Sequence, residues 1–354
     1  MAEAWRKIQL PRLLQPSTQI LARRLAYELP QEMSHSIPRS KDESSRASPV
    51  AAAPHLGRNP APHSETHLEA FAATMTEKFL SVRGTTICLC TWGPESGPLV
   101  LCLHGILEQG ASWLEVATRL AAQGYRIVAP DLRGHGRSTH VQQGNSYNLL
   151  DFLADLDGIV EQIADKPFTL VGHSLGSVVG ALFASIRPHR IRNLIMVETI
   201  LPSEVSDEEA VDQLTTHLDY LAKPLEHPVF PDVETAAERL RLSTPALSKA
   251  LAMLLAERIT EPCEGGVRWR WAPLLRTRAG IAFNGISKSR YLGMLRRIRN
   301  PITLIYGDRS QFNRQDDLQE QRQALTNAQR IVVPGGHNLP IDAPAAIADA
   351  ILSS

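Results

Sequence analysis

The chain has 354 residues, which is enough for one large catalytic domain together with an insertion or an extension. Its 37 basic and 37 acidic side chains balance, so the overall charge gives no support for a nucleic-acid partner. Hydrophobic residues make up 43% of the chain, which indicates a sizeable core, yet no apolar run is long enough to predict a transmembrane segment.

The first 70 or so residues lack the pattern of a folded core. Residues 17–29 place leucines on one helical face and predict a short helix. Residues 30–66 are rich in Ser, Pro and Ala, which is typical of a flexible linker. The start of the chain also lacks the apolar stretch of a signal peptide. We therefore expect a flexible N-terminal extension over residues 1–70 and a cytoplasmic protein.

Short apolar runs then alternate with helix-like segments. The predicted strands are 79–82, 86–90, 98–103, 125–129, 168–172, 194–197, 302–306 and 329–333, and the predicted helices between or after them are 113–123, 149–165, 177–186 and 344–352. The first two strands are expected to be antiparallel around a turn at Arg83-Gly84. The alternation predicts an α/β fold with a mainly parallel sheet covered by helices on both faces.

One interval breaks this alternation. Between Pro202 and about Arg299 we expect three or four helices and no strand, with Ser206 and Asp232 as N-caps and Thr244-Pro245 at the start of a third helix. The domain prediction is therefore a core of residues 71–201 and 299–354, interrupted by a helical cap of residues 202–298.

The four cysteines show no spacing typical of a zinc site or a redox motif. Cys88, Cys90 and Cys102 lie in strand-like apolar runs, where we expect buried thiols of the kind found in a reducing compartment. The sequence contains no cluster of metal ligands and no phosphate-binding glycine loop, so we expect neither a metal nor an organic cofactor.

A G-x-S-x-G motif at residues 172–176 lies between a predicted strand and a predicted helix. In that context the serine occupies a sharp turn, and its hydroxyl is exposed beyond the sheet. The helix begins at once, so the amide of Leu175 can stabilise an oxyanion. The motif predicts Ser174 as a nucleophile.

Two further loops carry candidates for residues that would act together with Ser174. His337 follows the final predicted strand and comes last in the order serine, acid, histidine, which predicts it as the general base. The loop after the first buried strand places the amide of Ile106 as a second oxyanion donor. His104 and the loop 131–138 are interpreted as scaffolding.

The acid that orients His337 has two candidates. The usual position lies three residues after Gly307, where this chain has Ser310, and Asp308 lies only one residue after that glycine. Glu198 ends the preceding strand and is also within reach of the histidine. We prefer Glu198, with Asp308 as the alternative.

Residues near these loops are candidates for substrate binding. Leu107, Trp113 and His173 are predicted there, and Trp269, Trp271 and Tyr291 of the cap either line the pocket or form the core of the cap. The expected partner is a small molecule with an apolar acyl group.

Taken in order, these motifs resemble the α/β-hydrolase superfamily over about residues 76–201 and 298–354. Residues 131–138 look like the D-x-R-G-H-G-x-S signature of its esterase and epoxide-hydrolase-like branch, and residues 196–200 are similar to the strand end where some haloalkane dehalogenases keep a glutamate. Residues 268–276 look like the serine-hydrolase-like subgroup. Dehalogenases and epoxide hydrolases use an aspartate nucleophile, so the resemblance implies cleavage of an ester, thioester or lactone instead.

Two other functions remain open at this point. The same residues could transfer the acyl group to an alcohol or amine, or close it into a ring, if the cap excludes water. A non-catalytic receptor that reuses the fold is the third possibility.

Overall fold

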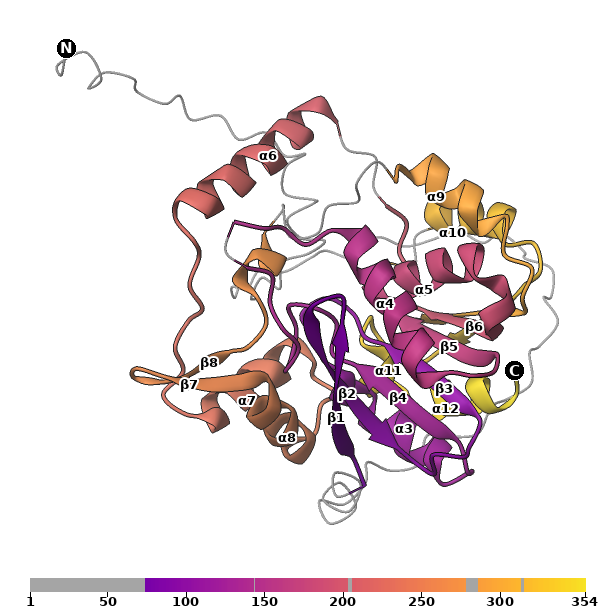
Figure 1. The fold of residues 1–354 in the computed structure, drawn as a ribbon, viewed down its shortest axis with the longest axis horizontal. Helices are drawn as coiled ribbons and strands as arrows, with labels where there is room; N and C mark the ends of the chain where they lie inside the picture. Colours follow the sequence, from indigo (N-terminus) through magenta and orange to yellow (C-terminus); the bar gives the residue numbers. More distant parts are fainter. Residues whose placement is uncertain (1–73, 143, 203–205, 278–285, 313–314) are drawn as a thin grey trace, which may run out of the picture. The chain divides into compact units, whose positions relative to one another are not determined.

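The computed structural model describes residues 74–142, 144–202, 206–277, 286–312 and 315–354. The predicted N-terminal helix and linker lie outside the described residues. The predicted alternation of strands and helices is confirmed in the part that is described (Figure 1).

The sheet has eight strands in the order β1-β2-β4-β3-β5-β6-β9-β10. In chain order they are β1 (Thr76–Val82), β2 (Thr85–Trp92), β3 (Leu99–Leu103), β4 (Arg126–Pro130), β5 (Phe168–His173), β6 (Ile191–Val197), β9 (Ile302–Gly307) and β10 (Ala328–Val333). β2 pairs antiparallel with both β1 and β4, and all other pairs are parallel. All residues of β5 are buried, as expected for a central strand covered on both faces.

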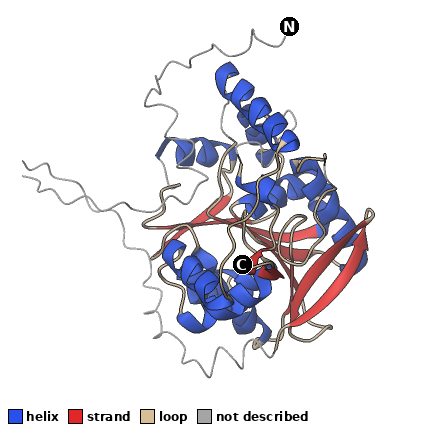
Figure 2. Ribbon diagram, turned by 90° about the vertical axis from the view of Figure 1, so that its left-hand side faces the viewer, coloured by secondary structure: helices blue, strands red, loops and turns tan. Residues whose placement is uncertain are grey.

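Helices cover both faces of this sheet (Figure 2). Apolar residues of α4 (Leu149–Ile163), α5 (Leu175–Ile186) and α9 (Lys288–Leu295) form one core cluster with the sheet. Those of α3 (Leu114–Ala121), α11 (Leu339–Asp342) and α12 (Pro344–Leu352) belong to a second cluster, on the other face. The carboxyl ends of the parallel strands therefore meet at one edge, where loops can gather catalytic side chains.

The interval between β6 and β9 is mainly helical, as predicted. It contains α6 (Asp207–Ala222), α7 (Val233–Ser243), α8 (Lys249–Ile259) and α9. Ser206 forms a capping box at the start of α6, and Asp232 caps α7. The prediction at Thr244-Pro245 was wrong, because α8 starts after Ser248, whose hydroxyl accepts from the Leu251 amide.

The expectation of no strand in this interval was also wrong. β7 (Thr260–Cys263) and β8 (Gly266–Trp269) form an antiparallel hairpin, and Gly265 in the turn between them has a positive φ of 86°. The two strands have four residues each, too few for a clear alternating pattern.

A buried arginine on α8 attaches the segment between β6 and β9 to the loops at the sheet edge. Arg258 is 4% exposed, and its Nη2 donates to Oδ2 of Asp131 at 2.8 Å. Its Nη1 donates to Oε1 of Gln109 at 2.8 Å, and Nε2 of Gln109 donates back to the Leu255 carbonyl of α8 at 3.0 Å. An arginine buried with its carboxylate fixes α8 on the sheet, since separating the charges leaves both desolvated.

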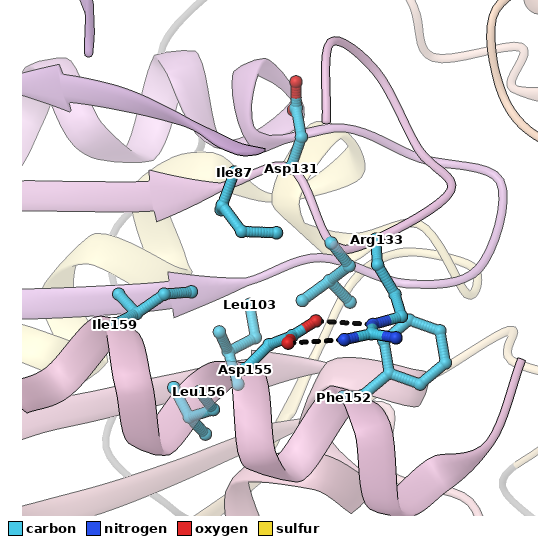
Figure 3. A pocket seen from close by; sticks show the side chains of 9 residues that line it. Ile87, Leu103, Asp131, Arg133, Phe152, Asp155, Leu156 and Ile159 are labelled. Atoms are coloured by element: carbon cyan, nitrogen blue, oxygen red, sulfur yellow. Dashed lines mark hydrogen bonds and ion pairs between the residues drawn. The ribbon is translucent and has the colours of Figure 1, made fainter. Parts of the chain in front are cut away.

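The loop 131–138 is a buried scaffold, as predicted. Arg133 donates two hydrogen bonds, of 2.5 and 2.6 Å, to the carboxylate of Asp155 in α4. Figure 3 shows this pair beside a small cavity between the sheet and α4, whose other lining includes the apolar side chains of Ile87, Leu103, Phe152, Leu156 and Ile159. The cavity belongs to the packing beneath the loop.

The predicted burial of the thiols is confirmed, because Cys88, Cys90 and Cys102 are all 0% exposed. Burial raises the pKa of the Cys88 thiol to about 12, so it stays protonated and unreactive. Within the described ranges, no helix has the length and apolarity needed to cross a bilayer.

Candidate active site

Ser174 occupies a tight turn between β5 and α5. Its backbone has φ 49° and ψ −113°, and its amide donates to the Val197 carbonyl at 3.0 Å. A Cβ at Gly172 would come within 2.4 Å of the Gly176 carbonyl oxygen, and one at Gly176 within 2.3 Å of a carbonyl oxygen of β3. Only glycine fits on both sides, which is the reason why the motif folds into this turn.

His337 and Glu198 are brought together at the carboxyl end of the sheet. Nδ1 of His337 lies 3.0 Å from Oε2 of Glu198, which follows β6 directly. Glu198 is completely buried, whereas the His337 side chain is 21% exposed. The ring centroid of His337 lies 4.9 Å from that of His173, the residue before Ser174, so His337 lies next to the turn that carries Ser174.

The carboxylate of Glu198 is held by its own set of donors. The Gly307 amide donates to Oε1 at 2.6 Å, and the Ser310 hydroxyl donates to Oε2. The Glu198 backbone has a positive φ of 50°, in a region that costs a non-glycine residue about 1–3 kcal/mol. Strain of that size persists only where the surroundings impose it, and here three hydrogen bonds do so.

Asp308, the alternative acid, has other contacts. Its Oδ1 accepts from the Gly335 amide at 2.9 Å, and its side chain is 48% exposed next to Arg309. Ser310, at the usual position of the acid, contributes its hydroxyl to Glu198 instead. In the sequence, Ser310 was notable only because it replaces the usual acid, and nothing indicated this supporting role.

The two predicted oxyanion donors belong to different segments, α5 and the loop after β3. Leu175 is the first residue of α5, and Ile106 is half-buried in the loop of residues 104–109, here called the oxyanion loop after its predicted role. Leu107 next to it has a positive φ of 62° and is also half-buried. Leu175 directly follows Ser174 at the N-terminus of α5, where a backbone amide is suited to stabilise a developing oxyanion.

Glu108 is a member of the site that sequence reasoning missed. Its Oε2 accepts from the Gly105 amide at 3.0 Å, and its Oε1 lies 3.0 Å from Nδ1 of His173. Burial by itself would raise the pKa of Glu108, but the contact with His173 holds that pKa down at about 2. Nε2 of His173 donates to the His337 carbonyl at 2.8 Å, so His173 joins three loops.

The pKa of His337 is lowered below its ordinary value by burial. The hydrogen bond to Glu198 acts in the opposite direction, and the nearby charge of His173 adds to the lowering. A histidine with a depressed pKa is neutral at physiological pH, which is the form that accepts a proton.

His104 is structural, as predicted. It is fully buried, its Nε2 accepts from the Leu132 amide at 2.9 Å, and its Nδ1 donates to the Gly105 carbonyl at 2.6 Å. These bonds fix the oxyanion loop above the scaffold loop. Burial lowers the pKa of His104, so the ring is neutral.

The predicted pocket residues fall into different environments. Trp113 and His173, both predicted to bind substrate, are 0% exposed, and Trp113 lies within the core cluster that includes α3. Tyr291 is completely buried in the core cluster that includes α4 and α5, and Trp269 and Trp271 are 7% exposed in the cluster that includes α3. Leu107 keeps partial exposure, and Phe312, which the sequence reasoning missed, packs 4.3 Å from the His337 ring between centroids.

Among the described residues, no three His, Cys, Asp or Glu side chains gather in a way that could hold a metal ion. The groups that do gather are a histidine in contact with a buried glutamate and, next to them, a serine with a positive φ. Chemically, this arrangement can activate a hydroxyl and stabilise an oxyanion.

Comparison with known proteins gives the family context. The family model described as the alpha/beta hydrolase fold matches residues 98–344. A serine hydrolase-like protein of Danio rerio is 33% identical over 183 residues, which cover 49% of this chain and 55% of that protein. Serine hydrolase-like protein 2 of Homo sapiens is 28% identical over 303 residues, covering 79% of this chain and 93% of that protein.

Among solved structures, a thioesterase domain from the curacin biosynthetic pathway is 53% identical, with a TM-score of 0.76. The match covers 79% of this chain and 99% of that domain. The chain spans little more than half of the Danio rerio relative, but nearly the whole of the thioesterase domain.

Proposed function

The chain belongs to the α/β-hydrolase family, and from that membership we propose that it is a serine hydrolase that cleaves acyl thioesters through an acyl-enzyme intermediate. In the proposed triad, Ser174 is the nucleophile, His337 the general base and Glu198 the acid. The observation that carries the proposal is the 3.0 Å contact between Nδ1 of His337 and Oε2 of Glu198. It fixes the tautomer in which Nε2 is free to accept a proton.

The first half-reaction forms the acyl-enzyme. Oγ of Ser174 attacks the carbonyl carbon of the thioester while Nε2 of His337 takes the hydroxyl proton. The amides of Ile106 and Leu175 stabilise the oxyanion of the tetrahedral intermediate. The carbon–sulfur bond then breaks, and the protonated His337 gives its proton to the departing thiolate.

The second half-reaction releases the acid. His337 removes a proton from a water molecule as the water attacks the acyl carbon, and the proton returns to Oγ of Ser174 when the ester bond breaks. Glu198 stays ionised throughout and stabilises the imidazolium that forms twice in each turnover.

The choice of a thioester rests on similarity and on chemistry. The thioesterase domain resembles this chain over nearly its whole length, at 53% identity. A thiol has a pKa of about 8.5, far below that of an alcohol, so it leaves with little help from an acid. The partial exposure of Leu107 and the packing of Phe312 on the base support an apolar acyl group, and the cap of residues 202–298 is proposed to select it.

A fluorophosphonate probe and two matched series of substrates test the proposal. Wild type and Ser174→Ala are incubated with the probe and with thioesters and oxygen esters of the same acyl chains, and released thiol or alcohol is measured. We expect labelling and turnover in wild type, a loss of at least about 10⁴-fold in the variant, and a preference for thioesters.

Other outcomes contradict separate parts of the proposal. Absence of labelling in wild type would refute the serine mechanism, and labelling with turnover of oxygen esters alone would refute the thioester assignment. An acylated amine or alcohol that outcompetes the free acid would show transfer instead of hydrolysis.

A further inference from the structure

The proposed triad leaves unused a second pair of ionisable side chains directly beneath the nucleophile. Glu108 lies in the oxyanion loop, and His173 ends β5 immediately before Ser174. The His173 side chain is 0% exposed and the Glu108 side chain is 21% exposed, so water can reach only the glutamate of this pair.

Both ring nitrogens of His173 face hydrogen-bond acceptors. Nδ1 lies 3.0 and 3.2 Å from the two carboxylate oxygens of Glu108, and Nε2 lies 2.8 Å from the His337 carbonyl. A neutral imidazole has only one N–H, so it would turn a lone pair toward one of these acceptors. While Glu108 is ionised, the ring satisfies both contacts only as an imidazolium.

A shared proton on Glu108 would be the other way to satisfy this geometry. Glu108 already accepts from the Gly105 amide at 3.0 Å, which favours its ionised form. In agreement with that geometry, the pKa of Glu108 is lowered and the pKa of His173 is raised by their mutual contact, against the burial of each. The pair is therefore an ion pair.

We propose that Glu108 and His173 form a charged positioning pair that holds the oxyanion loop, the nucleophile turn and the loop of residues 334–338 together and keeps a positive charge beside His337. This role deepens the proposed function and rests on it. Glu108 closes the oxyanion loop through Gly105, and His173 holds the base through the backbone carbonyl of His337.

The oxyanion loop and the nucleophile turn approach each other closely at Gly105. A Cβ at Gly105 would come within 2.9 Å of Oε1 of Glu108 and 3.0 Å of Nδ1 of His173. A side chain at position 105 would therefore push on both members of the ion pair.

The charge of His173 acts on His337 among several other groups. Those facing His337 or its loop are Glu198 from the end of β6, Glu108 from the oxyanion loop, Asp308 and Arg309 after β9, and Asp342 of α11. His173 opposes protonation of His337 and Glu108 favours it, with His173 the stronger of the two. A loss of both charges should therefore make His337 easier to protonate.

Glu108→Gln separates charge from hydrogen bonding. The amide oxygen can accept from the Gly105 N–H and the amide nitrogen can donate to Nδ1 of His173, which then becomes neutral and keeps its bond to the His337 carbonyl. Glu95→Gln is the matched control, because Glu95 precedes β3 at the opposite end of the strands and its side chain is 75% exposed.

Nitrogen-15 spectra of the imidazole rings in the full chain measure the charge directly, with His173→Gln identifying the signal. At about pH 7 we expect both nitrogens of His173 to be protonated in wild type and only one in Glu108→Gln. A neutral His173 in wild type would overturn the proposal. These spectra do not depend on turnover, so they decide the ion pair even if the proposed hydrolase activity fails its own test.

The pH profile of kcat/KM measures the effect on the base. We expect the acid limb to move to higher pH by about half a unit to one unit in Glu108→Gln, and to stay in place in Glu95→Gln. A purely structural role would lower kcat without moving the limb, and that result would also overturn the proposal.

Discussion

Replacement of Glu198 by glutamine tests the proposed triad with little change in shape. Oε1 of Glu198 accepts from the Gly307 amide at 2.6 Å, so the glutamine oxygen must take that position. Its NH₂ group then replaces Oε2 and faces Nδ1 of His337 and the hydroxyl of Ser310. The hydroxyl can turn to accept, but the imidazole must present a lone pair at Nδ1 and carry its proton on Nε2.

In that tautomer His337 cannot accept the proton of Ser174, and the imidazolium loses its counter-ion. We expect kcat to fall about 10⁴-fold, which corresponds to about 5.5 kcal/mol of activation free energy. The free energy of unfolding should change little, because every buried donor and acceptor keeps a partner.

The measurement is kcat for thioester hydrolysis, with the urea midpoint as a check on folding. Asp308→Asn is the matched control, since Asp308 is exposed and bonds to the Gly335 amide, and it should lose less than about 10-fold. A loss of less than about 10-fold in Glu198→Gln, or a larger loss in Asp308→Asn, would refute the reasoning.

Three further predictions concern the cap, the base and the nucleophile turn. Arg258→Met leaves the buried Asp131 carboxylate without its arginine, so the free energy of unfolding in urea should fall by about 3–5 kcal/mol. A change below about 1 kcal/mol would contradict the stabilising role of this ion pair. The pKa of His337 is lowered below the ordinary 6.5, so its active neutral form is lost only at a pH below that value. The plateau of kcat/KM should therefore extend below pH 6.5. An acid limb centred above pH 6.5 would contradict this expectation. Gly176→Ala places a Cβ 2.3 Å from a backbone oxygen and should destabilise the chain by about 2 kcal/mol or more, whereas Gly293→Ala in α9 meets no atom within 4 Å and should be neutral or stabilising in the same thermal scan.

The parts of the site that were predicted from sequence are those encoded in consecutive residues. The G-x-S-x-G turn is local, because the two glycines and the strand and helix on either side are all within one short segment. His337 was predicted because its loop follows the last strand, and parallel strands bring their carboxyl ends to one edge.

Supporting contacts between distant segments were not predicted. Glu108 and His173 are 65 residues apart, and Ser310 and Glu198 are 112 apart. Arg258 and Asp131 are 127 apart. Each of these side chains is common at protein surfaces, so nothing in its immediate sequence distinguishes a buried partner from a solvated charge.

The sequence by itself determined the α/β fold, the nucleophile turn and the loop of the base, because hydrophobic periodicity and glycine positions act over a few residues. The tertiary structure alone decided which carboxylate meets His337. Sequence could offer both Glu198 and Asp308, since each ends a neighbouring strand. The contact of Glu198 with His337 and the hydrogen-bond donors around its carboxylate distinguish the two candidates. Both features form only after β6 and β9 have paired.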